Sequence, residues 1–448
     1  MIKRRLLVIS FHYPPDGSIG GQRWAGLSKY LARAGWEVHV VTASAPKGYA
    51  MPSGVHRHFR PRRRTLNEWY RARVSARAAD AGSDGASLPQ SGKRPGGRLT
   101  RALILARRIA GSAAGLPDQG RGWIIRASGA ALSLMRSREF DCVISSGPPH
   151  SAHFAALIAT LGRRTEFWID MRDPWSTTHE MNSVADRFVR AERYVLHKLE
   201  RMVFPRASKV LVNTSEFAAM LRETQPDLNV LHFPNGVDTE LLPPRDLSAV
   251  RPGSIAYVGT LYAGRDLSSI LVAMRSVAEE SEGSRSALTL NVAGPLESPH
   301  RERMHSQIEA SGLADAVKVL GVLPRDSALQ LLSRSHLALV LAQDQPMCVP
   351  AKLYESVGLG IPTLVIAERD SAAAREARRI GAFTAESHDV NAIKGVLADL
   401  ASGRIPMKID PTTPISYEAL AVRMDRLLSG APVQQLEMSV SSSLPHPA

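Results

Sequence analysis

The chain has 448 residues, too many for one compact core, and its length suggests two or three domains of roughly 150 residues each. With 44% hydrophobic and 22% charged residues, its composition is ordinary for a globular protein, and no window approaches the ~18 uninterrupted apolar residues of a membrane span. The only cysteines, Cys142 and Cys348, lie far apart without metal-ligand spacing, which argues against a disulfide framework and for a reducing compartment.

The net charge of +14 is unevenly distributed. Residues 92–138 carry ten Lys or Arg side chains against one acid, Asp118, and a second basic cluster spans residues 57–64. Such a field attracts phosphates, whether on nucleic acid, anionic lipid or a diphosphate-linked substrate, and does not choose among them. The apolar stretch from Leu6 to Ser10 is too short for the core of a signal peptide, so we expect a cytoplasmic protein.

The first half of the chain begins as a β-α-β unit. The continuous apolar run 6–10 predicts a parallel strand buried on both faces, followed by a Gly/Pro-rich loop at 14–21, a helix at 22–34 and a strand at 37–42. Further strands are expected at 142–145, 166–169 and 209–213, and helices at 151–161, 184–202 and 215–223.

The second half repeats the alternation after a Pro-rich stretch at 243–253, which we interpret as an interdomain linker. Strands are expected at 254–259, 288–293, 318–320, 337–342 and 363–366, with helices at 268–280, 301–310, 327–333 and 352–357.

These patterns predict an α/β protein with two Rossmann-like, doubly wound parallel-sheet domains that face a central cleft, where open sheets bind ligands at their carboxyl edges. The domains are expected at 1–245, with a basic flexible insertion at about 57–138, and at 250–410; a helix at 411–430 and a disordered tail at 431–448 follow.

Three loops of the first half carry candidate residues. Gly20 and Gly21 precede a helix N-terminus, where glycine lets the backbone approach a phosphate, although a merely flexible loop is the alternative. His150 follows a strand and can hydrogen-bond a substrate or shuttle a proton; metal binding with His153 is less favoured because no partner ligand is evident. Arg172 and Asp173 form either an ion-paired wall of the cleft or a brace for their loop.

Two segments of the second half suit a sugar nucleotide. Gly259 begins a glycine loop in which Arg265 and Asp266 follow, and one arginine there can hold a pyrophosphate and stabilise charge on a departing diphosphate. The helix after Pro350 presents Lys352, Leu353 and Glu355; its N-terminus is an anion site, and a carboxylate one turn in can accept hydrogen bonds from sugar hydroxyls. The alternatives are a solvated arginine and an ordinary helix with an exposed glutamate.

In order along the chain, the segments SSGPPHSAH (145–153), DMRDPW (170–175), FPNGVD (233–238), YVGTLYAGRD (257–266) and PAKLYESVGLGIP (350–362) resemble glycosyltransferase family 4 enzymes of the GT-B fold. The resemblance runs from about residue 5 to 425 and is greatest for bacterial members of polysaccharide biosynthesis. It implies retaining transfer of a hexose from a nucleotide diphosphate sugar, with no cofactor and no essential metal.

The resemblance also implies roles for individual residues. Glu355 matches the residue that binds ribose hydroxyls, Arg265 the basic residue on the diphosphate, Gly21 a backbone contact near the phosphates, and His150 the histidine beside the donor sugar. The chain departs from the family at Met347, where a first glutamate is usual, and at Thr260, where many relatives have a second arginine. Asp344 is a hypothetical substitute for the missing carboxylate.

We therefore expect a hexosyltransferase with His150, Arg265 and Asp173 in catalysis and the other candidates in substrate binding. Its partners would be a nucleotide diphosphate sugar and a glycan or lipid-linked acceptor, with the basic insertion on an anionic membrane surface at the inner face of the cell membrane. A sugar-nucleotide epimerase and a catalytically inactive partner subunit are the alternatives. Nucleic acid is not an expected partner, because no recognised motif with interleaved aromatic residues accompanies the basic charge.

Overall fold

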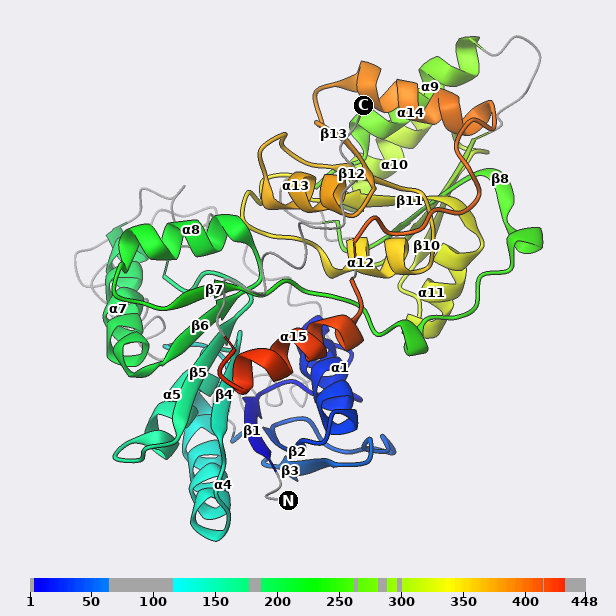
Figure 1. The fold of residues 1–448 in the computed structure, drawn as a ribbon. Coiled ribbons are helices and arrows are strands. Elements are labelled where there is room, and N and C mark those ends of the chain that lie inside the picture. The colour runs from blue at the N-terminus through cyan, green and yellow to red at the C-terminus, as the bar shows by residue number, and fades with distance from the viewer. Residues whose placement is uncertain are drawn as a thin grey trace, which may run out of the picture. The chain divides into compact units, whose positions relative to one another are not determined.

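The computed structural model describes residues 4–63, 116–176, 187–261, 265–280, 288–295, 300–413 and 415–431. The chain divides into two compact units, each built around one β-sheet (Figure 1). The first unit contains Met1–Gly21, Trp36–Leu211 and Asp227–Val230. The second unit contains Gln22–Gly35, Val212–Pro226 and Leu231–Ala448.

The first sheet has seven strands in the order β3-β2-β1-β4-β5-β6-β7, and the pairs from β3 to β5 are parallel. The interior strand β1 carries the predicted apolar run, and Leu6, Val8 and Ile9 are fully buried, as a strand covered on both faces requires. The strands are β1 (Arg5–Ser10), β2 (Glu37–Thr42), β3 (Val55–Phe59), β4 (Cys142–Gly147), β5 (Glu166–Met171), β6 (Lys209–Val212) and β7 (Val230–His232).

The helices between these strands pack mainly through small and aliphatic residues. The α4 and α5 helices lie side by side, α5 also contacts β1, β4 and β5, and α4 buries Ala127, Ala131 and Leu134. The Thr214 hydroxyl caps α8 by accepting a hydrogen bond from the Phe217 amide. The helices are α1 (Ile19–Arg33), α4 (Ile124–Ser137), α5 (Ser151–Thr160), α7 (Arg187–Val203) and α8 (Ser215–Thr224), with 3-10 turns at Arg121–Trp123 and Phe204–Arg206.

The second sheet has six strands in the order β10-β9-β8-β11-β12-β13, and every pair is parallel. Alternate residues of β11 enter different apolar clusters: Leu337, Leu339 and Leu341 join one, while Val340 joins another. Both faces of this sheet are therefore covered, as in a doubly wound fold. The strands are β8 (Arg251–Val258), β9 (Thr289–Ala293), β10 (Val317–Gly321), β11 (Ser335–Leu341), β12 (Thr363–Ile366) and β13 (Phe383–Ala385).

The helices from α9 onward alternate with or follow the strands of the second sheet along the chain. The α9 helix packs against α10 and α14, and hydroxyl or carboxylate caps at Ser371, Asp389 and Ser416 begin three of the helices. The helices are α9 (Ser268–Glu280), α10 (His300–Ser311), α11 (Arg325–Ser333), α12 (Ala351–Gly358), α13 (Ala372–Arg379), α14 (Val390–Ala401) and α15 (Tyr417–Leu428), with 3-10 turns at Thr239–Leu241 and Leu247–Ala249.

Several expected boundaries are confirmed, and others are wrong. The β2, β12 and α9 elements have the predicted bounds. The β3, β7 and β13 strands and the α4, α13 and α14 helices were not predicted. Pro252 and Gly253 belong to β8 rather than to a linker, and α1 begins at Ile19, which places Gly20 and Gly21 in its first turn.

The predicted flexible insertion at 57–138 is wrong at both ends. Residues 57–59 lie in β3, and residues 121–137 form a 3-10 turn and α4, with the Trp123 side chain fully buried. Burial of that indole and of the small residues of α4 offsets the entropy of ordering an Ala/Ser/Arg-rich segment. The middle of the predicted insertion, 64–115, and the tail from 432 onward lie outside the described residues.

Among the residues that the structure describes, none of the helices combines the length and the apolar character needed to cross a bilayer.

Candidate functional site

Most candidate residues follow strands that flank the reversal of strand order in their own sheet. The order reverses between β1 and β4 in the first sheet and between β8 and β11 in the second. The loops after two such neighbouring strands run to opposite faces of a sheet and leave a crevice at its carboxyl edge. Gly20 and His150 follow β1 and β4, whereas Gly259 and Glu355 follow β8 and β11.

In the first unit, the structure brings Gly20 and Arg172 into contact. A Cβ atom on Gly20 would lie only 2.3 Å from Nη1 of Arg172, so the guanidinium lies directly against this turn of the backbone. At Gly21 a Cβ would lie 3.0 Å from Cα of Tyr13, and its amide donates to the Ser18 carbonyl at 3.0 Å. Both glycines are therefore closely packed against other parts of the protein, and their approach to a phosphate stays a prediction.

Arg172 is oriented by the loop between β4 and α5. Its Nε donates to the Gly147 carbonyl at 3.2 Å, its backbone amide donates to the same carbonyl at 3.1 Å, and Nη2 donates to the Pro148 carbonyl. These bonds join the loops after β4 and β5. Arg172 therefore serves as a brace for both loops, one of the two interpretations that the sequence allowed.

His150 is a buried, neutral imidazole at the N-cap of α5, with 7% of its surface exposed. Its ring stacks on Trp175, with centroids 4.7 Å apart and planes at 14°. Its Nδ1 lies 3.4 Å from Nε2 of His153, whose Nδ1 lies 2.8 Å from the Ser145 hydroxyl. Burial, together with the nearby His153 and Arg172, lowers the pKa of His150 well below its usual value. The ring can therefore donate or accept a hydrogen bond without carrying charge.

Asp173 is half-buried next to Arg172. Burial raises the pKa of its carboxyl, and the positive charge of Arg172 opposes the shift. A carboxyl with a raised pKa in a loop at the sheet edge is suited to accept or return a proton.

In the second unit, Gly259 lines a small pocket of about 150 Å³. A Cβ on Gly259 would lie 2.7 Å from the Tyr257 hydroxyl oxygen and 3.0 Å from Nζ of Lys352. Gly294 has φ +137, and a Cβ there would lie 1.9 Å from the Gly259 carbonyl oxygen. Only glycine fits this contact between the ends of β8 and β9. The pocket is lined by Val258, Gly259, Thr260, Ala293, Gly294, Pro295, Val322, Leu323, Ala328 and Lys352.

Lys352 lies in the first turn of α12, where burial disfavours the positive charge of its amine. Burial lowers the pKa of its amine to about 8; the carboxylate of Glu355 opposes this shift, while the positive charges of Arg265 and Arg325 add to it. Glu355 accepts a hydrogen bond from Nη2 of Arg325 at 2.6 Å. Arg325 and Lys352 thus flank the Glu355 carboxylate, and Arg265 lies within electrostatic reach of Lys352. This excess of positive charge beside the Gly259 pocket favours an added anion.

Arg265 and Asp266 lie where the chain leads into α9. Nη2 of Arg265 donates to Oε1 of Gln345 at 2.8 Å, and Oδ1 of Asp266 accepts from the Ser268 amide at 2.9 Å. Asp266 therefore caps the start of α9, a structural task. The Leu353 side chain is fully buried in an apolar cluster and its amide donates to the Pro350 carbonyl, so this residue holds α12 in place.

Two residues that hydrogen-bond candidate residues or the helices that carry them were not predicted from the sequence. Arg325, which pairs with Glu355, begins α11 after β10, and its place after a strand of the same sheet was the available signal. Asp118 accepts a hydrogen bond from the Ser151 amide at 2.8 Å and so anchors the helix that carries His150. No local pattern in the sequence marks that contact.

Two family models match consecutive parts of the chain: a glycosyl transferase 4-like domain matches residues 20–236, and glycosyl transferases group 1 matches residues 240–408. A search of curated protein sequences finds no match.

Solved structures show the same fold along nearly the whole chain. Sucrose-phosphate synthase from Thermosynechococcus elongatus is 14% identical with a TM-score of 0.57, covering 97% of this chain and 100% of its own. HepE from Anabaena, solved with UDP-glucose, is 13% identical with a TM-score of 0.55, covering 95% and 99%. A putative UDP-N-acetylglucosamine 2-epimerase from Listeria monocytogenes is 13% identical with a TM-score of 0.54, covering 96% of each chain.

These likenesses and the two parallel sheets confirm the predicted GT-B fold. Together with the two glycosyltransferase models that follow one another along residues 20–408, they establish that the chain belongs to the family 4-like glycosyltransferases.

Proposed function

We propose that the protein is a retaining hexosyltransferase that moves a hexose from a nucleotide diphosphate sugar to a glycan or lipid-linked acceptor. The observation that carries the proposal is the pair of basic side chains, Arg325 and Lys352, beside Glu355 and next to the small pocket at Gly259 and Gly294. In this proposal residues 250–410 hold the nucleotide, and residues 1–245 present the acceptor.

The donor would bind with its diphosphate on the positive side chains of the second unit. Lys352 and Arg265 would contact the phosphate oxygens, and Gly259 would let the backbone approach them. Glu355, oriented by its 2.6 Å bond from Arg325, would accept hydrogen bonds from the ribose hydroxyls. The base would enter the pocket of about 150 Å³ at the ends of β8, β9 and β10. HepE, which has the same fold, was solved with UDP-glucose, and this supports a nucleotide-sugar donor.

The chemistry would consist of one exchange at the anomeric carbon. The bond from this carbon to the β-phosphate oxygen breaks, and a bond to the acceptor hydroxyl oxygen forms on the same face of the sugar. The acceptor proton passes to the leaving phosphate oxygen, so a nucleoside diphosphate departs. Lys352 and Arg265 would stabilise the charge on that leaving group, and the neutral ring of His150 would hydrogen-bond the sugar.

The first unit also has a surface that could dock on a membrane carrying the acceptor. At the amino-terminal edge of the first sheet, Arg5, Arg136, Arg138, Arg163 and Arg164 line an open concavity of about 780 Å³ together with the acidic Glu139, Asp141 and Glu166, so basic side chains outnumber acidic ones there. These arginines add to the basic segment and support docking on an anionic inner membrane surface that carries a lipid-linked acceptor. Cys142 and Cys348 are not joined in a disulfide, which fits a cytoplasmic location.

A sugar-nucleotide epimerase is the second candidate. The putative epimerase from Listeria has the same fold at a comparable TM-score, and Met347 replaces the usual first glutamate in this chain. Asp344, the hypothetical substitute, is exposed with φ 58, and its backbone amide donates to Glu368. The absence of the usual first glutamate, where this chain has Met347, would also suit a catalytically inactive partner subunit.

The test combines binding and turnover. The protein is first titrated with UDP, GDP and their hexose conjugates, and bound donors are then incubated with and without lipid-linked acceptors. Transfer of labelled hexose with the anomeric configuration retained supports the proposal. Conversion of the donor to its epimer selects the second candidate, and binding without either reaction indicates an inactive subunit.

The Glu355→Gln variant probes the site itself. Loss of charge-assisted bonds to ribose should weaken nucleotide binding by roughly 10- to 100-fold, at about 1.5–3 kcal/mol for a bond to a charged group. The matched control is Glu279→Gln, because Glu279 forms an exposed ion pair with Arg275 at 2.7 Å on α9. Equal nucleotide affinities for the two variants would remove Glu355 from the site.

A further inference from the structure

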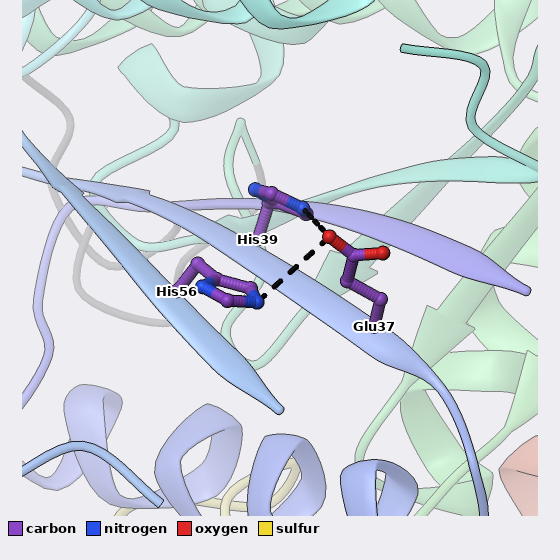
Figure 2. Close-up of side chains that lie close together, drawn as sticks. All are labelled: Glu37, His39 and His56. Atoms are coloured by element: carbon purple, nitrogen blue, oxygen red, sulfur yellow. Dashed lines mark hydrogen bonds and ion pairs between the residues drawn. The ribbon is translucent and has the colours of Figure 1, made fainter. Parts of the chain in front are cut away.

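A histidine-rich cluster lies on β2 and β3, at the edge of the first sheet. Glu37 and His39 are two residues apart on β2, and His56 and His58 are two residues apart on β3, so each pair shares a face of its strand. The parallel register places His39 opposite His56. Figure 2 shows Glu37, His39 and His56 with both imidazoles directed at the same carboxylate oxygen.

The spacing of the three ligand atoms suits a metal ion. Oε1 of Glu37 lies 3.1 Å from Nε2 of His39 and 3.8 Å from Nε2 of His56, and one ligand atom from each residue lies within 4.8 Å of the others. In a tetrahedral zinc site with bonds of about 2.0–2.1 Å, neighbouring ligand atoms are roughly 3.3 Å apart. A small rotation of His56, whose side chain is 49% exposed, would complete that spacing.

The outer contacts of the cluster match those that orient metal ligands. Oε2 of Glu37 accepts from Nε of Arg5 at 3.0 Å, which leaves Oε1 to face the imidazoles. Nδ1 of His39 lies 2.9 Å from Nε2 of His58. In the structure Nε2 of His39 donates to Oε1 of Glu37, whereas a metal on Nε2 requires the proton on Nδ1. In that tautomer Nε2 of His58 is placed to accept the Nδ1 proton and so to support ligation.

We propose that Glu37, His39 and His56 form a binding site for a divalent transition metal, with Zn²⁺ the best match. Two imidazoles and one carboxylate suit zinc, and the exposed side of His56 leaves a fourth position open to water. The metal would fasten β3, the last strand of its sheet, to β2. The site lies toward the amino ends of these strands, whereas the candidate residues follow the carboxyl ends of β1, β4 and β5, so the proposal does not depend on the donor site.

The experiment uses the full chain without a histidine tag, stripped by a chelator and titrated with Zn²⁺ alone against a chromophoric competitor. One equivalent should bind and raise the melting temperature. Co²⁺ in the same site should give the intense visible absorption of a tetrahedral N/O environment. The His56→Ala variant, truncated at a half-exposed position that tolerates the change, should lose at least tenfold in Zn²⁺ affinity.

Two further variants separate ligation from general structural effects. His58→Phe keeps the ring stacked on His39, where the centroids are 5.2 Å apart, but removes the proton acceptor and should cost 10- to 100-fold in metal affinity. His388→Ala is the control, because His388 lies 3.8 Å from Glu386 in an exposed pair. The proposal is overturned if His56→Ala binds Zn²⁺ as the unaltered protein does, if Co²⁺ keeps its octahedral spectrum, or if His388→Ala alone abolishes binding.

Discussion

Replacing Lys352 by Met should make the protein more stable and at the same time weaken nucleotide binding. The amine is held in the folded protein with its pKa lowered from 10.5 to about 8, mainly by burial. The folded state therefore binds this proton less tightly than the unfolded chain does, and the charge is a cost to folding at neutral pH. Methionine keeps the length of the side chain and removes the charge.

The magnitude follows from the pKa. At 1.36 kcal/mol per pKa unit, lowering the pKa from 10.5 to about 8 corresponds to at most about 3 kcal/mol of lost stability. The side chain is partly exposed, and solvent screening reduces the expected gain on mutation to about 1–2 kcal/mol. For a unit of roughly 150–250 residues, this gain corresponds to about 2–8 °C in melting temperature.

The stability difference between the Lys352→Met variant and the unaltered protein should depend on pH. Below pH 8 the amine is charged in both states and the full cost applies, so the Lys352→Met variant should exceed the unaltered protein by its greatest margin at pH 7. Between pH 8 and 10.5 the folded protein has released the proton and the unfolded chain has not, so the margin shrinks, and above 10.5 it disappears.

Paired thermal unfolding of the two proteins from pH 6 to 10.5 measures this margin, and the difference between them cancels the titration of all other groups. The variant should also lose affinity for a nucleoside diphosphate. In the unaltered protein, binding that anion at pH 8 to 9 should be accompanied by proton uptake at Lys352, seen by calorimetry in buffers of different ionisation enthalpy. A variant less stable at pH 7, or a margin that does not change with pH, would refute the reasoning.

Two further predictions concern the ends of the strands. Gly294→Ala should cost about 2–4 kcal/mol in the free energy of unfolding, because φ +137 strains any other residue and the new Cβ would lie 1.9 Å from the Gly259 carbonyl oxygen. The control is Gly395→Ala in α14, where a Cβ meets nothing within 4 Å, and this variant should be neutral or more stable. Equal denaturant midpoints for the two variants would contradict the cost predicted for Gly294→Ala. His150→Phe keeps the ring stack on Trp175 but removes the ring nitrogens, so turnover should fall by about 10²-fold with little change in melting temperature, and unaltered kcat would exclude His150 from the reaction.

The secondary structure was predictable where the local pattern was unambiguous. The continuous apolar run of β1 and the boundaries of β2, β12 and α9 follow from hydrophobic periodicity and from the residues that flank them. Short edge strands such as β3 and β13 escaped detection, because three to five residues with polar side chains carry no clear period of two. The α4 helix was mistaken for a flexible segment, since its small residues become a packing surface only against α5.

The types of residue at the candidate site could be predicted from the sequence, but their partners could not. Glycine, arginine and histidine after apolar strands already indicated a sheet edge suited to phosphates, because parallel strands end at a common edge. The bond from Arg325 to Glu355, the stack of His150 on Trp175 and the lowered pKa of Lys352 all depend on side chains that are distant in sequence or on burial.

The histidine cluster shows most directly where local sequence ends and tertiary structure begins. The sequence by itself determined that Glu37 and His39 share a face of the predicted strand at 37–42, because side chains alternate along an extended chain. That residues 55–59 also form a strand, with His56 and His58 on one face, came only from the structure. Only the tertiary structure decided that the two strands pair in parallel with His39 opposite His56. Strand register is set by the burial of the whole sheet, and a slip of one residue would send one pair of side chains to the other face.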